Sequence, residues 1–298
     1  MTTVLAAGAA VVDFVFQLDE APSRSEKHRA RDAAIVGGGC AANAAVAVAR
    51  LGGKAILAAR MGDDVIGDMI VGDLQAENVD CSLVRRIEGR RSSYSSVIID
   101  PAGERSIVNY RDPQIDAVGN WLEKRTMPDF DAALADTRWP DGARVAMRAA
   151  RERGVPGVID GEAPVREAQE ALDMATHIAF SAAGLRDLDG IEDTQAALKA
   201  AAAQTGAWVC VTAGEGGVRW LDGETMRHFP AFRVEAVDTL GAGDVWHGAF
   251  ALALAQGKSE EDAIIFASAT SALKCKQFGG RSGTPSEDQV EHFLKENS

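Results

Sequence analysis

Short apolar segments alternate with longer alanine-rich segments along most of the chain. The alanine-rich segments have the length and apolar spacing of helices: Ala41–Leu51, Val65–Asn78, Gly142–Arg153, Ile191–Gln204, Ala242–Gln256 and Glu261–Lys274. This order predicts an α/β fold with a doubly wound, mostly parallel sheet flanked by helices. The apolar runs, which carry few charges and end near Asp, Gly, Ser or Thr, are the expected strands: Val4–Ala7, Ala55–Ala59, Ala132–Ala135, Gly157–Ile159, Ile178–Ser181 and Trp208–Thr212.

Two segments depart from this alternation, approximately residues 11–33 and 92–112. Within the second, the β-rich runs Tyr94–Asp100 and Ser106–Tyr110 flank the turn sequence Pro101–Glu104, which predicts a hairpin. We expect both segments to form a small β-sheet lid within a single domain that spans the chain. Such a lid has an edge and an apolar face, and a homodimer that pairs two lids would cover both.

The charge balance restricts the partners. The 298 residues include 31 Lys and Arg against 44 Asp and Glu, for a net charge of −13. The overall field repels polyanions, so neither a nucleic acid nor an anionic membrane surface is an expected partner. Cys40, Cys81, Cys210 and Cys275 are too far apart in the sequence to indicate zinc or a disulfide framework. With no basic signal-peptide start and no apolar run near the ~20 residues of a membrane span, a cytoplasmic protein is expected.

The most informative motif is D-T-L-G-A-G-D at residues 238–244, which leads into an apolar helix. The small residues Gly241, Ala242 and Gly243 let an anion approach the open N–H groups at the helix start, where the helix dipole favours negative charge. Asp244 lies in the first turn, where a carboxylate can take a proton from an attacking hydroxyl. A G-x-G sequence alone would indicate only a glycine-rich helix start; the acidic residues on both sides favour phosphoryl transfer.

A second glycine-rich segment, V-G-G-G-C-A-A-N-A at residues 36–44, also opens a helix. It lacks the G-x-G-x-x-G spacing of dinucleotide-binding folds and the G-K-[ST] ending of a P-loop. Asn43, one turn into the helix, can both donate to and accept from a hydroxyl group. The segment itself fits two interpretations, a polar-ligand site and close packing of a helix on a strand.

Together these segments resemble the signatures of the PfkB (ribokinase-like) family of ATP-dependent carbohydrate kinases. The first signature matches residues 37–43 and continues through L-G-x-x-A-x(4)-R-M-G-D-D at 51–64, and the second matches residues 238–244. The resemblance covers essentially the whole chain. It implies a ribokinase-like doubly wound sheet with a β lid, ATP and Mg²⁺ as co-substrates, and a sugar hydroxyl as the phosphoryl acceptor.

The resemblance also implies roles for individual residues at the sugar side of the site. Asp244 matches the catalytic base of the family, and the three small residues before it match the anion hole. Asp13 matches a sugar-binding aspartate; without the family it would be read as a turn residue at a strand end. Further sugar contacts are implied for Gly38, Gly39 and Asn43.

At the nucleotide side, T-A-G-E-G-G at residues 212–217 resembles the family's phosphate and ribose loop, although alone it indicates only a turn. The segment G-G-R-S-G at 279–283 resembles a terminal loop where some members bind a monovalent cation. A helix that borders adenine in the family can equally be a surface helix here. The implied nucleotide contacts are Thr212, Gly214, Gly217, Thr270, Lys274 and Gly280.

The chain departs from the family at one place that concerns the metal. Members often carry N-x-x-E after the strand that corresponds to Ile178–Ser181, and the glutamate organises water around Mg²⁺. Here the segment Phe180–Leu185 reads F-S-A-A-G-L and contains no glutamate. We therefore assign no metal ligand; Mg²⁺ can also be held mainly by ATP oxygens and water.

Three residues near the lid bear on the acceptor: Lys27, Asn109 and Arg138. Two cations and an amide at this side suit an anionic terminal group, and the surrounding A-D-T-R-W-x-D-G-A text is closest to the sulfofructose kinase branch, where the corresponding residues hold the sulfonate. The resemblance implies phosphorylation of the 1-hydroxyl of 6-deoxy-6-sulfofructose. Alternatives are a kinase for fructose, 2-keto-3-deoxygluconate or ribose, a non-catalytic sugar or nucleotide sensor, and, less favoured, a nucleoside kinase.

Overall fold

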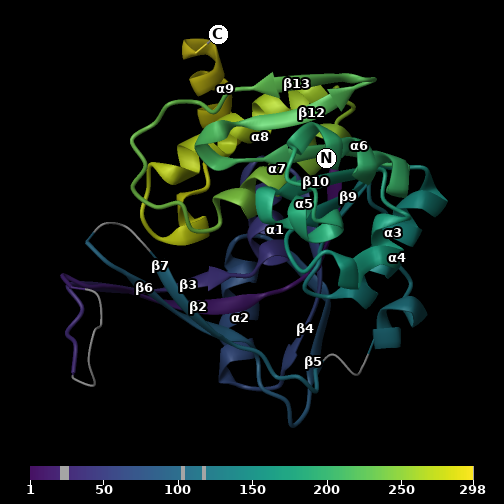
Figure 1. Cartoon of the computed structure of the whole chain (residues 1–298). Helices are drawn as coiled ribbons and strands as arrows, with labels where there is room; N and C mark the ends of the chain where they lie inside the picture. The colour runs from purple at the N-terminus through teal and green to yellow at the C-terminus, as the bar shows by residue number, and fades with distance from the viewer. Residues whose placement is uncertain (21–26, 102–104, 116–118, 298) are drawn as a thin grey trace.

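The centre of the molecule is a nine-stranded sheet in the order β13-β12-β11-β10-β9-β8-β1-β4-β5 (Figure 1). The structure is a computed structural model that describes residues 1–20, 27–101, 105–115 and 119–297. From β11 to β5 the strands run parallel, and β12 and β13 add an antiparallel edge. Every strand predicted from the apolar runs is present. The bounds are β1 Thr3–Gly8, β4 Lys54–Gly62, β5 Asp80–Ile87, β8 Ala132–Asp136, β9 Gly157–Gly161, β10 His177–Ser181, β11 Trp208–Thr212, β12 Val218–Asp222 and β13 Thr225–Phe229.

Helices cover both faces of this sheet. Because strand side chains alternate, Val4 and Ala6 of β1 belong to one hydrophobic cluster, and Leu5 and Ala7 belong to the other. The first cluster packs against α1, α2, α7, α8 and α9, and the second packs against α3, α4, α5 and α6. The bounds are α1 Cys40–Arg50, α2 Val65–Ala76, α3 Pro140–Arg153, α4 Gln169–Leu172, α5 Ala182–Asp189, α6 Thr194–Thr205, α7 Ala242–Ala255, α8 Glu260–Cys275 and α9 Glu287–Glu296.

Several elements were not predicted, and their sequences show why. Strand β5 reads D-C-S-L-V-R-R-I and buries only Leu83 fully, because it lies at the sheet edge. Strand β13 is exposed along most of its length for the same reason. Helix α5 has only 8 residues, too few for a clear apolar period. Helix α6 begins at Thr194, where Asp193 accepts a hydrogen bond from Ala196 N, rather than at Ile191 as expected.

A separate four-stranded sheet, in the order β3-β2-β6-β7, projects from the main body (Figure 1). The predicted hairpin is confirmed, since β6 (Tyr94–Ile99) and β7 (Arg105–Tyr110) pair antiparallel; residues 102–104 of its turn lie outside the described residues. Strand β2 is Val11–Gln17. Strand β3, Asp32–Gly38, corrects the expected boundary near residue 33, because the strand continues into the glycine-rich segment.

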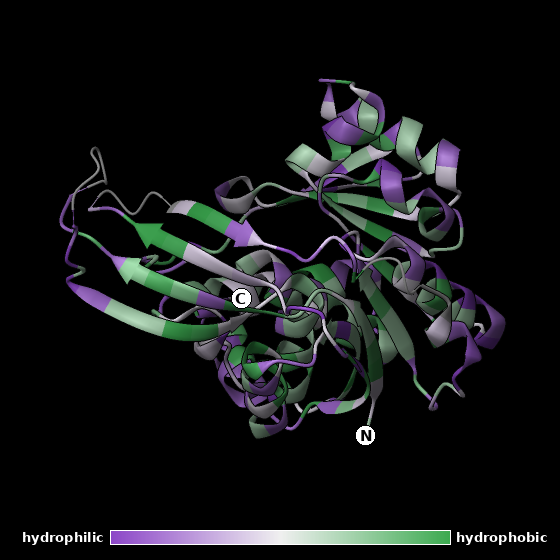
Figure 2. Cartoon of the chain, turned by 90° about the horizontal axis from the view of Figure 1, so that it is seen from below, coloured by the Kyte–Doolittle hydropathy of each residue, from purple (hydrophilic) through white to green (hydrophobic). Residues whose placement is uncertain are grey.

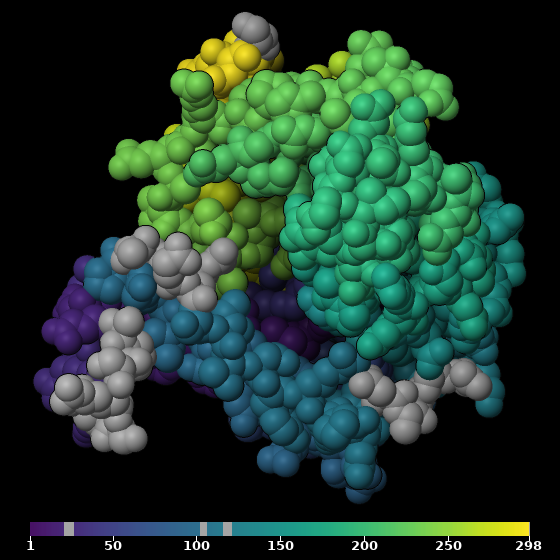
Figure 3. All heavy atoms as spheres, viewed as in Figure 1, coloured from purple at the N-terminus to yellow at the C-terminus, as the bar shows by residue number. Residues whose placement is uncertain are grey.

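The carboxyl ends of the parallel strands open toward the small sheet. The space-filling view shows a hollow between the small sheet, the teal segments after β9 and β10, and the green segment before α7 (Figure 3). In open α/β sheets, ligands bind at this edge. Within the described part of the chain, no helix is long and apolar enough to cross a membrane.

Candidate active site

Helix α7 presents a carboxylate and a group of unused amides at its first turn. The helix is apolar on all sides and buried from Val245 to Leu254, so packing fixes its position. In the described part of the chain, the N–H groups of Gly241, Gly243 and Asp244 donate to no acceptor. These amides and the helix dipole form a site for an anion next to the Asp244 carboxylate.

Asn43 joins the two glycine-rich segments. Its Nδ2 donates to Asp244 Oδ2 over 2.7 Å, although the two residues are 201 positions apart. On its other side, Arg281 Nη1 donates to Asn43 Oδ1 over 3.4 Å. The amide orientation is thereby fixed, and the second oxygen of Asp244 remains available to a substrate hydroxyl.

The predicted sugar residues of the small sheet lie in one row across its strands. Asp13 on β2 is paired with Ser95 on β6, and Ser95 is paired with Asn109 on β7. Asn109 Nδ2 donates to Ser95 Oγ over 3.1 Å, and the Ser95 hydroxyl in turn hydrogen-bonds the Asp13 carboxylate. A side chain at Gly38 would collide with that carboxylate, since a Cβ there would lie 2.2 Å from Asp13 Oδ2.

Asp13 and Asp244 are close enough to influence each other's charge. Burial raises the pKa of Asp13 above its ordinary value; the Ser95 hydrogen bond opposes this shift, and the charge of Asp244 adds to it. Gly38, Gly39 and Asn43, which the sequence predicted to bind the sugar together with Asp13, lie beside these aspartates. The structure brings all of them to one place, from β2, β3, α1 and α7.

Asp136, at the end of β8, was missed by the sequence analysis. Its Oδ2 accepts hydrogen bonds from Ala9 N over 2.8 Å and Ala41 N over 3.0 Å, and its Oδ1 accepts from Arg138 N over 2.9 Å. It therefore fixes both the loop after β1 and the start of α1. An aspartate directly after an apolar run was the available signal.

The sequence analysis also did not single out Asp160, His247 and Cys40. Asp160 and Cys40 lie next to Asp244, and His247 lies next to Asp160. Burial raises the pKa of Asp160 to about 7, the His247 charge opposes this shift, and Asp244 and Asp136 reinforce it. His247 Nε2 lies 3.6 Å from Asp160 Oδ1, and the two ring nitrogens of His247 also face the carbonyl oxygens of Gly243 and Ala179. Burial and the nearby aspartates raise the pKa of the Cys40 thiol, so it remains protonated and is a poor nucleophile.

The three residues predicted to hold an anionic group of the acceptor differ in their surroundings. Arg138 follows β8, and its Nη1 donates to Ala163 O over 2.7 Å. Arg111 Nη2 and Arg60 Nη2 donate to the backbone carbonyl of Arg138 over 2.7 and 3.4 Å, so two guanidinium groups meet at that carbonyl. Asn109 lies in the row with Asp13. Lys27 is exposed ahead of β3 and makes no hydrogen bond or ion pair with the residues that the structure describes.

The nucleotide predictions need a correction at α8. Thr270 and Lys274 are fully buried; Thr270 Oγ1 donates to Phe266 O over 2.8 Å, and Lys274 Nζ donates to Asp238 O over 2.8 Å. Their side chains point into the protein and cannot border adenine. Gly280 is also buried, and its N–H donates to Asp238 Oδ2 over 2.8 Å.

The loop after β11 has the expected position. Thr212 ends the strand at the carboxyl edge, and Gly214 and Gly217 bound a short 3₁₀ turn, Gly214–Gly216, before β12. Thr212 Oγ1 donates to Phe180 O over 3.3 Å.

The segment without the family's glutamate forms the start of α5. Ser181 Oγ accepts from Gly184 N over 2.9 Å and caps α5. A Cβ at Gly184 would lie 1.7 Å from Gly161 O, so no side chain fits at that position. A metal ligand set nearby consists of Asp160, Asp244 and the Cys40 thiol, whose ligand atoms lie within 4.8 Å of one another. The two carboxylates suit Mg²⁺, and the thiol does not.

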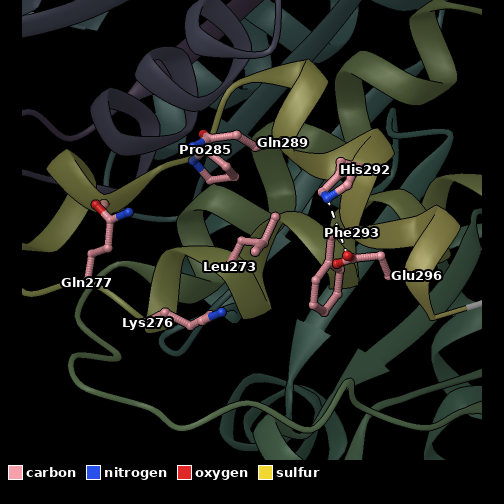
Figure 4. A pocket seen from close by; sticks show the side chains of 9 residues that line it. Leu273, Lys276, Gln277, Pro285, Gln289, His292, Phe293 and Glu296 are labelled. Atoms are coloured by element: carbon pink, nitrogen blue, oxygen red, sulfur yellow. Dashed lines mark ion pairs between the residues drawn. The ribbon is translucent and has the colours of Figure 1, made fainter.

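A pocket of about 300 Å³ lies elsewhere, between the end of α8 and α9 (Figure 4). Leu273, Pro285 and Phe293 form its apolar walls, and His292 and Glu296 are paired at its rim. None of its lining residues is among those predicted to bind sugar or nucleotide. We assign it no part in the reaction.

Comparison with known proteins decides the family. The model of the pfkB family of carbohydrate kinases matches residues 1–287. The chain belongs to the PfkB family of carbohydrate kinases. The ribokinase of Bacillus subtilis is 30% identical over 300 residues, which cover 99% of this chain and 100% of that protein. Fructokinase-1 of rice is 29% identical over 85% of this chain and 86% of its own length.

Solved structures agree with the PfkB assignment. A crystal structure from Agrobacterium tumefaciens is 37% identical, has a TM-score of 0.92, and covers 99% of this chain and 98% of its own. The ribokinase of Thermotoga maritima is 25% identical, with a TM-score of 0.83 and 99% coverage of both chains. The ribokinase-like fold and the ATP-dependent carbohydrate kinase activity predicted from the sequence are thereby confirmed.

Proposed function

We propose that this kinase transfers the γ-phosphoryl group of ATP to a sugar hydroxyl at Asp244. The observation that carries this proposal is the position of the Asp244 carboxylate, which lies beside the unused amides of Gly241 and Gly243 and is held by Asn43. A base and an anion site in contact are the requirements of phosphoryl transfer to an alcohol.

The reaction divides between these groups. The Asp244 carboxylate accepts the proton of the sugar hydroxyl while the oxygen of that hydroxyl forms a bond to the γ-phosphorus of ATP. The bond between that phosphorus and the bridging oxygen breaks, and ADP leaves with the electron pair. The amides at the start of α7 stabilise the charge on the transferring group because they are already oriented when the substrates bind.

The positions of the other segments suggest where ATP, Mg²⁺ and the sugar would bind. ATP would lie over the loop 212–217, with Mg²⁺ neutralising its phosphate charge; Asp160 is the carboxylate beside Asp244 that could hold the ion. Asp13, Gly38, Gly39 and Asn43 would bind the sugar. The small sheet would act as a lid that excludes water, a competing acceptor.

For the acceptor we propose the 1-hydroxyl of 6-deoxy-6-sulfofructose. The guanidinium groups of Arg60 and Arg111 lie at the backbone carbonyl of Arg138 in a chain of net charge −13, so positive charge is concentrated near Arg138 against the overall field. An arginine binds a sulfonate through parallel hydrogen bonds. Asn109 would donate from the lid by exchanging one of its hydrogen bonds to Ser95 Oγ and Tyr94 O for the sulfonate. Ribose is the second candidate, because relatives that match the full length of the chain are named ribokinase.

A panel of acceptors tests both candidates. We expect kcat/KM to be higher for sulfofructose than for ribose, fructose or 2-keto-3-deoxygluconate, with the product phosphorylated at C1 by NMR. Arg138→Ala should lower kcat/KM roughly 10–100-fold for sulfofructose and little for ribose, since the lost hydrogen bonds involve a charged group. Arg148→Ala, which removes an exposed guanidinium beside Glu123, is the matched control. A higher kcat/KM for ribose would refute the sulfonate assignment.

We further propose that two copies associate through the small sheet. Its face opposite the Asp13 row carries exposed apolar side chains, with Ile35 at 60% and Val108 at 70% exposure, and green bands mark the sheet in Figure 2. Apolar exposure of this kind is typical of an interface. A second lid would cover it and leave the polar row facing the sugar.

A further inference from the structure

A buried lysine lies behind the anion site. Lys274 on α8 is fully buried, its Nζ donates to Asp238 O over 2.8 Å, and the same nitrogen lies 3.8 Å from Asp238 Oδ2. Burying an ammonium group costs several kcal/mol unless a partner compensates it. The chain therefore buries a charged group, at a cost in free energy, next to Asp238, the first residue of the D-T-L-G-A-G-D motif.

Asp238 connects this lysine to the surrounding loops. Its Oδ1 accepts from Leu240 N over 2.8 Å, and its Oδ2 accepts from Gly279 N over 3.1 Å and from Gly280 N over 2.8 Å. Every oxygen of Asp238 thus has a donor from this chain. The residue ties the motif, α8 and the terminal loop together.

Helix α8 holds the motif at a second carbonyl as well. Ser271, about one turn before Lys274, donates from Oγ to Ala242 O over 2.9 Å. In a planar trans peptide the carbonyl and the following N–H point in opposite directions. Fixing the carbonyls of Asp238 and Ala242 toward α8 therefore directs the N–H groups of Thr239 and Gly243 away from α8.

We propose that Lys274 is a positioning residue whose ammonium serves as a built-in monovalent cation for the anion hole. The inference rests on the proposed role of the amides at the start of α7. A separate cation does not fit at this place, because the Lys274 ammonium and three backbone N–H groups already occupy the oxygens of Asp238. The family resemblance left a monovalent-cation requirement open; the proposal predicts that this kinase works without one.

The wild-type enzyme gives the first test. Turnover of the best acceptor is measured in Tris buffer with Tris-ATP and MgCl₂, with and without KCl or NH₄Cl, and with tetramethylammonium chloride to match ionic strength. We expect KCl and NH₄Cl to change kcat by less than a doubling. A several-fold activation by K⁺ would overturn the proposal, because it would mean that a free cation, and not the Lys274 ammonium, supports the anion hole.

The variant Lys274→Met gives the second test, since methionine replaces the aliphatic chain of the lysine but ends one atom short of Nζ, which leaves the place of the ammonium open. We expect kcat to fall roughly tenfold or more with little change in the sugar KM, because misdirected amides weaken transition-state binding. K⁺ or NH₄⁺, entering the place of the lost ammonium, should restore part of kcat. Lys199→Met is the matched control, because Lys199 lies at the surface beside Glu224.

Two outcomes decide the proposal independently of the substrate. K⁺ and NH₄⁺ should raise the Tm of Lys274→Met, and should not raise that of the wild type or of Lys199→Met. A folded Lys274→Met with wild-type kcat, or with no cation-specific change in Tm, would refute the built-in cation. If Lys274→Met does not fold, the wild-type cation response decides. Absence of sugar phosphorylation by the wild type would instead refute the proposed function, and the Tm comparison would still test Lys274.

Discussion

Asn43 shows how one side chain determines what a carboxylate can do. Its amide donates to Asp244 and accepts from Arg281, so it cannot rotate without losing a hydrogen bond. Asp244 Oδ2 is thereby occupied, and the other oxygen is the one that would accept the proton in the proposed reaction. The proposed base is positioned by residues from α1 and the terminal loop as well as by its own helix.

Replacing Asp244 by Asn tests the base directly. We expect Asp244→Asn to retain ATP binding and to lose a factor on the order of 10²–10⁴ in kcat, the usual contribution of a positioned base. Steady-state kinetics and calorimetric nucleotide binding are the measurements. Near-normal kcat in this variant would remove Asp244 from the mechanism.

The pH dependence of sugar binding depends on Asp13. Because burial raises the pKa of Asp13, protonation should weaken sugar binding at a pH above the ordinary 3.8 of an aspartate, so KM should rise as the pH falls through that range. Ser95→Ala removes a hydrogen bond that lowers this pKa, so the rise in KM should begin at a higher pH. KM is measured from pH 4 to 8. The same onset in wild type and Ser95→Ala would contradict this role of Asp13.

Between elements, Arg50 at the end of α1 connects three parts of the chain. Its guanidinium binds Glu77 through two hydrogen bonds of 2.6 and 2.8 Å, and its Nη1 donates to Ser282 O and Thr284 O. Helix α1, the end of α2 and the terminal loop are therefore joined. Since α1 carries Asn43, this connection supports the active site.

The acid dependence of stability should report this connection. The Arg50 hydrogen bonds lower the pKa of Glu77 below its ordinary 4.5, so the ionised pair stabilises the fold above that pH, and the effect is lost as the pH falls through the lowered pKa. We expect Glu77→Gln to lower Tm by a few degrees at pH 7 and to have no effect well below pH 4.5. Glu224→Gln, at an exposed ion pair, is the control with little effect. An equal loss of Tm at both pH values would contradict the ionic contribution.

At the scale of the whole molecule, the small sheet has two different faces. The row Asp13, Ser95 and Asn109 faces the site. Ile35 and Val108, which lie on the two edge strands with two strands between them, extend from the other side. One sheet can therefore close the site and provide an interface at the same time.

A charge on the outer face tests association. We expect Val108→Lys to convert a dimer into a monomer, because burying an unpaired ammonium in an apolar interface is strongly unfavourable. Light scattering after size-exclusion chromatography gives the mass of each form. Val65→Lys, at a 70% exposed valine on α2, is the matched control. A wild-type protein that is monomeric at all concentrations would contradict the proposal.

The sequence predicted the parallel strands and the main helices because their signals are local. A buried strand needs a short apolar run, and α7 needs a continuous apolar stretch, so Trp208–Thr212 and Ala242–Gln256 were recognisable. Edge strands such as β5 and β13 lack that signal, because half of their surface faces water. The proposed anion site was also recognisable from the sequence, because acidic residues flank the small residues at the start of α7.

The sequence by itself determined the α/β class, the family and the place of Asp244, the proposed base, at the start of α7. Only the tertiary structure decided that Asn43 holds Asp244, that Asp136 fixes the start of α1, and that Lys274 faces Asp238 and not a nucleotide. Propensity and spacing act between neighbours in the chain, and both are visible in the order of residues. The direction of a buried polar side chain depends on which distant donor or acceptor packing brings within 3 Å, and that is settled only when the chain has folded.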